Sequence, residues 1–263
     1  MWTRWCLVVC LGLAACAPPP DVATDETGPL QVLFIGSSYL AWHDAPEQCH
    51  QLLEAAGYQV HVGTVLKPGH FLDQLAGDPD VIAAIAARPW DLVVLQGGGM
   101  NVGYPESHHL VLPRMGRHSV ATALDTLTKA IAKRGARTIY VHPWAFEDGL
   151  LWIPDRGEDY AAMQGDIDRN VDVLARRFEL TVAPVGPAWE IAHTERPTVP
   201  LFAEDMNHPS LMGSYLMACV LTRTMTGVLP DTEAGRGLVP PATARYLREV
   251  AGRVSGAESV TQH

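Results

Sequence analysis

Residues that could together cleave an ester stand at two places in this chain, about 170 positions apart. The apolar stretch 31–35 leads directly into a turn that carries Ser38, and Asp205 and His208 stand three residues apart near the other end. A serine hydroxyl is a poor nucleophile at neutral pH unless a neighbouring base takes its proton. A histidine can be that base, and an aspartate beside it can orient the ring and stabilise the imidazolium. The residue types therefore predict a Ser38–His208–Asp205 catalytic triad.

Each motif has a plainer structural interpretation when it is taken alone. A Gly-Ser-Ser sequence after a strand is a common strand-to-helix turn, and here it places the hydroxyls of Ser37 and Ser38 side by side. Asp205 could simply cap a helix, since aspartate and asparagine are favoured N-caps. Pro209 fits the first turn of that helix, where its missing N–H costs nothing.

The residues that follow His208 reduce the weight of these plainer interpretations. Residues 205–216 read DMNHPSLMGSYL, which is similar to the Asp-x-x-His-Pro-Ser-x-x-Gly-x-Tyr-Leu block of GDSL-type esterases. Together with the serine turn, this block resembles the SGNH/GDSL hydrolase family. The family's turn is Gly-Asp-Ser or Gly-Asn-Ser, so Ser38 matches the nucleophile and Ser37 departs mildly from the pattern. The resemblance implies a serine hydrolase that needs no metal and no organic cofactor.

The resemblance also implies donors for the oxyanion of a tetrahedral intermediate. The family uses the backbone N–H of the nucleophile, that of a glycine after the second strand, and an asparagine side chain after the third. Ser38 and Gly69 match the first two. Instead of Gly-x-Asn-Asp, residues 95–101 read LQGGGMN, which is similar to the Gln-Gly-Glu variant of carbohydrate and sialate O-acetylesterases. We therefore prefer Gln96 over Asn101 as the third donor, although three glycines could also mark a flexible or closely packed loop.

The elements that must position these residues alternate along the chain as apolar strands and amphipathic helices, which is typical of a parallel sheet covered on both faces. Such sheets carry functional groups on loops at the carboxyl ends of their strands, and the predicted site residues fall there. We expect a flavodoxin-like (SGNH) three-layer α/β/α sandwich with a mostly parallel five-stranded sheet, in one domain over 30–263. The predicted strands are 31–35, 58–65, 91–95, 138–142 and 181–185. The predicted helices are 45–56, 70–76, 79–87, 117–134, 158–178, 209–225 and 240–254, with loops over 96–114 and 143–157 and an irregular segment at 186–204.

The first 29 residues are predicted to lie outside the folded domain, as a signal peptide followed by a tether. Residues 1–15 have a short basic start and an apolar run too brief to span a bilayer, so they predict a signal peptide. The run ends in a sequence that resembles a bacterial lipobox, which implies a lipidated Cys16; an ordinary signal peptide that happens to contain cysteine is the alternative. Residues 16–29 then form an extended tether to a membrane surface. Ala17 would favour the outer membrane of a Gram-negative source, facing the periplasm or the cell surface.

The net charge and the cysteines limit which partners, disulfides and metal sites the chain can have. A formal net charge of −10 argues against nucleic acid and against docking on anionic lipid through a basic patch, so we expect membrane contact through the lipid anchor only. Cys49 and Cys219 fall on helices that can pack side by side, and a disulfide or two buried thiols fit equally well. No Cys-x-x-Cys pair and no cysteine–histidine pair has zinc spacing.

The remaining chemically active side chains receive plainer interpretations. His142 could line the pocket or lie in the core, whereas His108 and His109 read as part of a solvated turn and Asp166 and Asp168 as a solvated helix face. Several large side chains near strand ends could wall an acyl or sugar site, although such residues more often serve packing. They are Trp42, Trp144, Trp152, Phe202 and Met206.

The sequence thus predicts an esterase for small acyl esters, with an O-acetyl group on a carbohydrate as the expected substrate. That expectation rests on the resemblance and the Gln-Gly segment. One alternative is an acyltransferase that uses the same triad. The other is a non-catalytic surface-binding lipoprotein, which the missing Gly-x-Asn motif supports and the intact Ser38, His208 and Asp205 set opposes.

Overall fold

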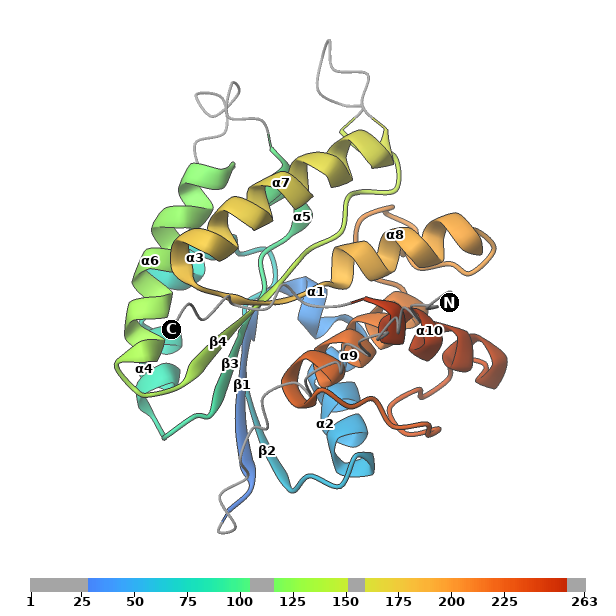
Figure 1. Ribbon diagram of the computed structural model, residues 1–263. Coiled ribbons are helices and arrows are strands. Elements are labelled where there is room, and N and C mark those ends of the chain that lie inside the picture. Colours follow the sequence, from blue (N-terminus) through green and yellow to red (C-terminus); the bar gives the residue numbers. More distant parts are fainter. Residues whose placement is uncertain (1–27, 105–115, 151–158, 255–263) are drawn as a thin grey trace, which may run out of the picture.

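A five-stranded sheet organises the computed structural model, which describes residues 28–104, 116–150 and 159–254 (Figure 1). All of its neighbouring strands run parallel, in the order β2-β1-β3-β4-β5. The predicted fold class is therefore confirmed, and each predicted strand lies within two residues of the observed one. The strands are β1 (Leu30–Gly36), β2 (Val60–Leu66), β3 (Leu92–Leu95), β4 (Arg137–Val141) and β5 (Thr181–Ala183).

Helices cover both faces of the sheet because the central strands are apolar on both faces. Along β1, Val32 and Phe34 pack into one hydrophobic cluster, and Leu33 and Ile35 pack into the other. The first cluster is completed by α2 (Ala45–Ala55), α8 (Val185–Glu195), α9 (Leu211–Thr226) and α10 (Pro241–Arg253), on one side of the sheet in Figure 1. The second is completed by α3 (Leu72–Gly77), α4 (Pro79–Ala86), α6 (Arg117–Ala132) and α7 (Tyr160–Phe178) on the opposite side.

The predicted irregular segment 186–204 is wrong over its first half, which forms α8. Gly186 and Pro187 are turn signals in a sequence, but here they occupy the first turn of the helix, where proline is tolerated. Gly186 serves close packing, because a Cβ on it would lie 2.3 Å from the carbonyl oxygen of Pro143. Trp189 is buried in α8, as expected of an anchor.

Short helical pieces also occupy segments where no separate element was predicted. After β1 the chain forms α1 (Ser38–Ala41) and then a 3₁₀ turn, η1 (Trp42–Asp44), before α2 begins. The glycine-rich stretch after β3 contains α5 (Gly99–Gly103), where a loop was predicted. A Cβ on Gly99 would lie 2.1 Å from the carbonyl oxygen of Trp144, so this stretch is closely packed.

Pro209 does not lie in the first turn of a helix, contrary to the prediction. It pairs with Phe202 in an isolated antiparallel bridge, and α9 begins two residues later. Ser210 is the N-cap, and its Oγ accepts hydrogen bonds from the backbone N–H groups of Met212 and Gly213.

Part of the sequence prediction lies outside the described residues. This applies to the signal peptide, to Cys16, to nearly all of the tether, and to His108, His109 and Trp152. Over the described part of the chain, every helix is too short or too polar to cross a bilayer.

Candidate active site

The fold brings Ser38, His208 and Asp205 into one chain of hydrogen bonds. Ser38 Oγ lies 2.8 Å from His208 Nε2, and His208 Nδ1 lies 2.5 Å from Asp205 Oδ2. Because a carboxylate only accepts hydrogen bonds, Nδ1 carries a proton, which leaves Nε2 free to accept the proton of Ser38. This arrangement can raise the nucleophilicity of the serine and return its proton to a leaving group.

The loop before α9 holds Asp205 in place to support the imidazole. Asp205 Oδ1 accepts hydrogen bonds from the backbone N–H groups of Asn207, at 3.1 Å, and His208, at 2.9 Å. Met206, between them, adopts a left-handed φ of 59°. Burial alone would raise the pKa of Asp205, but the bonds from the His208 side chain and from these two backbone groups hold it below its ordinary value. Asp205 therefore stays ionised beside the imidazole at neutral pH.

The turn that carries Ser38 is fixed from β3. Gln96 follows β3 and is 1% exposed, and its Oε1 accepts hydrogen bonds from Ser37 N at 2.9 Å and Ser37 Oγ at 3.2 Å. Gly36 is required beside this bond, because a Cβ there would lie 2.8 Å from Gln96 Oε1 and from a methyl carbon of Leu40. The turn thus presents Ser38 to His208, while Ser37 is held by its hydrogen bonds to Gln96.

The predicted oxyanion residues lie on loops next to this turn. Gly69 follows β2 in a left-handed conformation with φ of 77°, and its loop is joined to the turn where Lys67 N donates to Gly36 O at 2.9 Å. Gln96 Oε1 already accepts hydrogen bonds from Ser37. The amide nitrogen is therefore the part of this side chain that could donate a hydrogen bond to an oxyanion. Asn101, the other candidate, is buried in α5. The oxyanion roles of Ser38, Gly69 and Gln96 stay predictions.

Comparisons with known proteins show that several solved structures share the fold of this chain. No family model and no curated protein sequence matches the chain. A DUF4886 family protein from Bacteroides uniformis superposes with a TM-score of 0.66 at 18% identity, over 84% of this chain and 93% of that one. A proposed SGNH hydrolase from Slackia heliotrinireducens gives a TM-score of 0.60 at 22% identity, over 75% and 100%. The chain has the SGNH hydrolase fold.

A further structural neighbour is an enzyme of stated activity. Axe2, an acetylxylan esterase from Geobacillus stearothermophilus, superposes with a TM-score of 0.53 at 20% identity, over 74% of this chain and 94% of that one. Identities of this size establish a shared fold, so the chemistry of the present chain has to be argued from its own residues.

Within this SGNH fold, two aromatic rings contact the imidazole of His208. The ring of Trp42 stacks on His208 with centroids 4.1 Å apart and planes 15° apart, and the ring of Tyr39 lies 5.0 Å away. The Tyr39 hydroxyl donates to the side-chain oxygen of Asn207, and Trp144 Nε1 donates to the carbonyl oxygen of Asn207 at 3.1 Å. Tyr39 and Trp42, which follow Ser38 in the chain, therefore tie the loop that carries His208 to the turn that carries Ser38. Trp144 comes from the segment after β4 and packs against Tyr39, with ring centroids 5.3 Å apart.

The predicted pocket-wall residues divide into two groups. Trp42 and Met206 are 39% and 42% exposed and lie next to the triad, where they can meet a ligand. Trp144 and Phe202 are buried and pack against Trp189, so they serve the core as well as the site. Sequence reasoning missed Tyr39, whose only signal was its place directly after Ser38.

His142 has an acid partner away from the triad. It is buried at the end of β4, and its Nε2 lies 2.8 Å from Asp168 Oδ1 on α7. Gln164 donates to the same oxygen, also at 2.8 Å. The predicted solvated face is therefore only partly correct at Asp168. Its side chain is 43% exposed, but its carboxylate contacts His142 from the end of β4 and Gln164 from α7.

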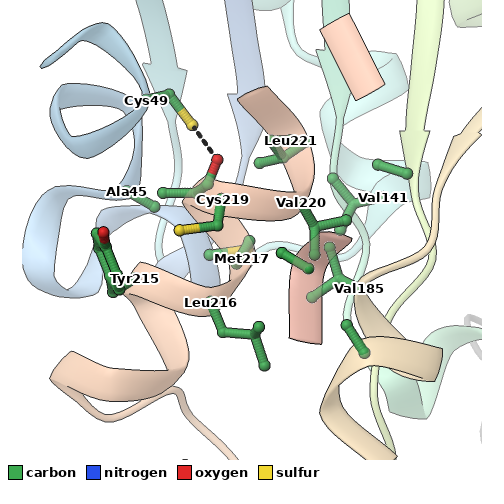
Figure 2. Close-up of a cluster of buried hydrophobic side chains, with 14 of the residues drawn as sticks. Ala45, Cys49, Val141, Val185, Tyr215, Leu216, Met217, Cys219, Val220 and Leu221 are labelled. Atoms are coloured by element: carbon green, nitrogen blue, oxygen red, sulfur yellow. Dashed lines mark hydrogen bonds between the residues drawn. The ribbon is translucent and has the colours of Figure 1, made fainter. Parts of the chain in front are cut away.

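Cys49 and Cys219 are both free and buried where α2 packs on α9 (Figure 2). The Sγ of Cys49 lies 3.6 Å from the carbonyl oxygen of Ala218. Of the two alternatives from the sequence, the structure therefore shows two buried thiols. Burial raises the pKa of both, that of Cys219 to about 12, which keeps them as neutral core residues.

Proposed function

We propose that this chain is a serine esterase that cleaves small acyl esters, with an O-acetyl group on a carbohydrate as its leading substrate. The observation that carries the proposal is the hydrogen-bonded sequence from Ser38 Oγ through His208 to Asp205. The SGNH fold, which this chain shares with an acetylxylan esterase, supports it. The hydrogen-bonded triad also speaks against the non-catalytic alternative.

The proposed reaction uses each member of the triad once in each half. Ser38 Oγ attacks the ester carbonyl while its proton passes to His208 Nε2, and Asp205 stabilises the resulting imidazolium. The tetrahedral intermediate collapses to an acyl-serine as the proton moves to the departing alcohol. Water then attacks the acyl-serine, His208 takes and returns one proton, and the carboxylic acid leaves. The N–H groups of Ser38 and Gly69 and the amide of Gln96 would stabilise the oxyanion in both halves.

The substrate part of the proposal has two supports. One neighbour with this fold is described as an acetylxylan esterase, and acetyl is the smallest common acyl group on a glycan. The second is the exposed pair of Trp42 and Met206 beside the triad. An exposed aromatic ring offers an apolar face to a sugar ring, whose C–H groups form a similar surface.

A fluorophosphonate probe tests the proposed nucleophile directly. The purified protein is incubated with the probe and digested, and the modified peptide is identified by mass spectrometry. We expect labelling at Ser38 that disappears in Ser38→Ala and falls strongly in His208→Gln, while the matched variant Ser37→Ala is still labelled. A folded protein that neither reacts with the probe nor hydrolyses p-nitrophenyl acetate would refute the esterase proposal.

We further propose that the mature chain is held at a bacterial membrane, the outer membrane in a Gram-negative source, through lipid on Cys16. The lipobox-like residues 13–16 support this. Cells fed a radioactive fatty acid should label the wild-type protein and leave Cys16→Ser unlabelled. Wild-type protein that fractionates with soluble proteins and carries no label would contradict the anchor.

A further inference from the structure

Trp42 is held against the imidazole of His208 while a substantial part of the residue stays exposed to solvent. Its ring stacks on the imidazole at 4.1 Å between centroids, with the two planes 15° apart, while 39% of the residue is exposed. A tryptophan placed only for packing would be covered by its neighbours. Here, one of the largest side chains in the chain stacks on the histidine and keeps part of its surface in solvent.

The backbone around Trp42 is fixed by contacts that its own loop does not supply. The carbonyl oxygen of Trp42 accepts a hydrogen bond at 3.1 Å from Ser214 Oγ, and Ser214 is fully buried in α9. The next two residues, His43 and Asp44, adopt left-handed φ angles of 55° and 51°. Such angles are unfavourable for residues with a Cβ and persist where the surroundings impose them. Two residues with unfavourable backbone angles therefore follow directly after Trp42.

Besides the Asp205 carboxylate, the indole of Trp42 is a second group beside His208 that can stabilise a positive charge on the imidazole. Among the described contacts, the imidazole meets the Asp205 carboxylate from its own loop and the hydroxyl of Ser38 from α1. It also meets the rings of Tyr39 and Trp42. Burial raises the pKa of Tyr39, so its phenol is neutral. An aromatic face within about 6 Å of a cation attracts it, and tryptophan does so most strongly.

We propose that Trp42 is a positioning residue for the catalytic base. Its indole keeps the imidazole plane in the orientation that directs Nε2 at Ser38 Oγ, and it stabilises the imidazolium that forms as the proton is transferred. The proposal rests on the proposed function, because it concerns the same proton transfer. Since the positive charge is absent in the ground state, the indole stabilises the transition state more than the bound substrate. Its loss should therefore lower kcat and leave KM nearly unchanged.

The test compares variants that keep or remove the aromatic face. Trp42→Leu keeps apolar cover without a π face, and Trp42→Phe keeps a smaller π face. With p-nitrophenyl acetate, we expect kcat of Trp42→Leu to fall by about 3- to 30-fold, the range that a cation–π contact supplies. KM should change by less than about twofold, and Trp42→Phe should recover most of kcat. Leu238→Ala, which alters a side chain that is 89% exposed, is the matched surface control and should behave as wild type.

Each outcome bears on the proposal. Equal kcat in wild type and Trp42→Leu, equal losses in the Leu and Phe variants, or a loss confined to KM would overturn it. If Trp42→Leu fails to fold, Trp42→Met provides the same comparison with a flexible apolar side chain. Fluorophosphonate labelling of wild-type Ser38 tests the esterase proposal separately from the role of Trp42. Labelling together with an inert Trp42 refutes this inference alone, whereas an unreactive wild type refutes the esterase and this inference with it.

Discussion

Gln96→Met is the substitution that most directly tests how the nucleophile turn is held. Methionine keeps the length and most of the volume of glutamine, so the site should not collapse. It removes Oε1, which accepts hydrogen bonds from both the N–H and the Oγ of Ser37. It also removes the amide nitrogen, which is the candidate third oxyanion donor.

The two lost functions have different expected sizes. Ser37 is 4% exposed, so its N–H loses a buried partner and gains no water in exchange. A buried donor without a partner costs about 1–3 kcal/mol of the free energy of unfolding. For a domain of this size, that loss lowers Tm by about 2–12 °C. Removal of one oxyanion donor lowers kcat by about 10²–10³-fold.

Thermal unfolding and initial rates of p-nitrophenyl acetate hydrolysis measure the two losses separately. The rates are taken below the Tm of the variant, so that a fall in kcat reflects the folded protein. Ser37→Ala is the matched control. It removes the hydroxyl but keeps the N–H bond to Gln96, so it should lose less than about 1.5 kcal/mol and retain most of kcat.

Two results would refute this reasoning. If Gln96→Met unfolds at the same temperature as wild type, the bond from Ser37 to Gln96 does not hold the turn. If kcat falls by less than about threefold in the folded variant, Gln96 is not an oxyanion donor. Asn101 would then be the remaining candidate from the segment after β3.

Two further predictions follow from the ionisable groups. The pKa of Asp205 is held below its ordinary value of 3.8, so its contribution to stability is present above that pH and is lost as the pH falls through the depressed folded value. The Tm of wild type should therefore exceed that of Asp205→Asn at neutral pH, and this difference should vanish in acid. The kcat of the variant should fall by about 10⁴-fold. A difference in Tm that stays constant down to strongly acidic pH would count against an ionised Asp205. Iodoacetamide should leave Cys49 and Cys219 unmodified in native protein and alkylate both in guanidinium chloride. The reason is that burial raises the pKa of each thiol in the native fold. Peptide maps that show rapid alkylation of the native protein would contradict this burial.

The meeting of Ser38, His208 and Asp205 could be predicted because its determinants are local. The strand-to-turn sequence places Ser38 at the carboxyl end of β1. Asp205 and His208 are close enough in the chain to meet within one loop, whatever the rest of the fold does. The parallel-sheet pattern then supplies the edge at which the two segments converge.

The surroundings of the triad could not be predicted, because they depend on contacts between distant segments. Nothing in the local sequence says that Trp42 would lie on an imidazole 166 positions away or that Gln96 would accept from Ser37 across 59 positions. Asp168 shows the same limit. The sequence placed it on a helix surface, but it could not show that its carboxylate meets His142 from the end of a strand. The missed α8 has a different cause, since its opening Gly-Pro pair is a signal for a turn in most contexts.

The burial of α9 makes the candidate active site as stable as the whole fold. This helix packs against α2, α8 and α10, and most of its side chains are buried. It begins three residues after His208 and also carries Ser214, which holds Trp42. Backbone amides in such a central helix exchange with solvent only when the whole domain opens. Amide exchange in α9 should therefore be among the slowest in the protein, and heat inactivation should follow the cooperative unfolding transition instead of preceding it.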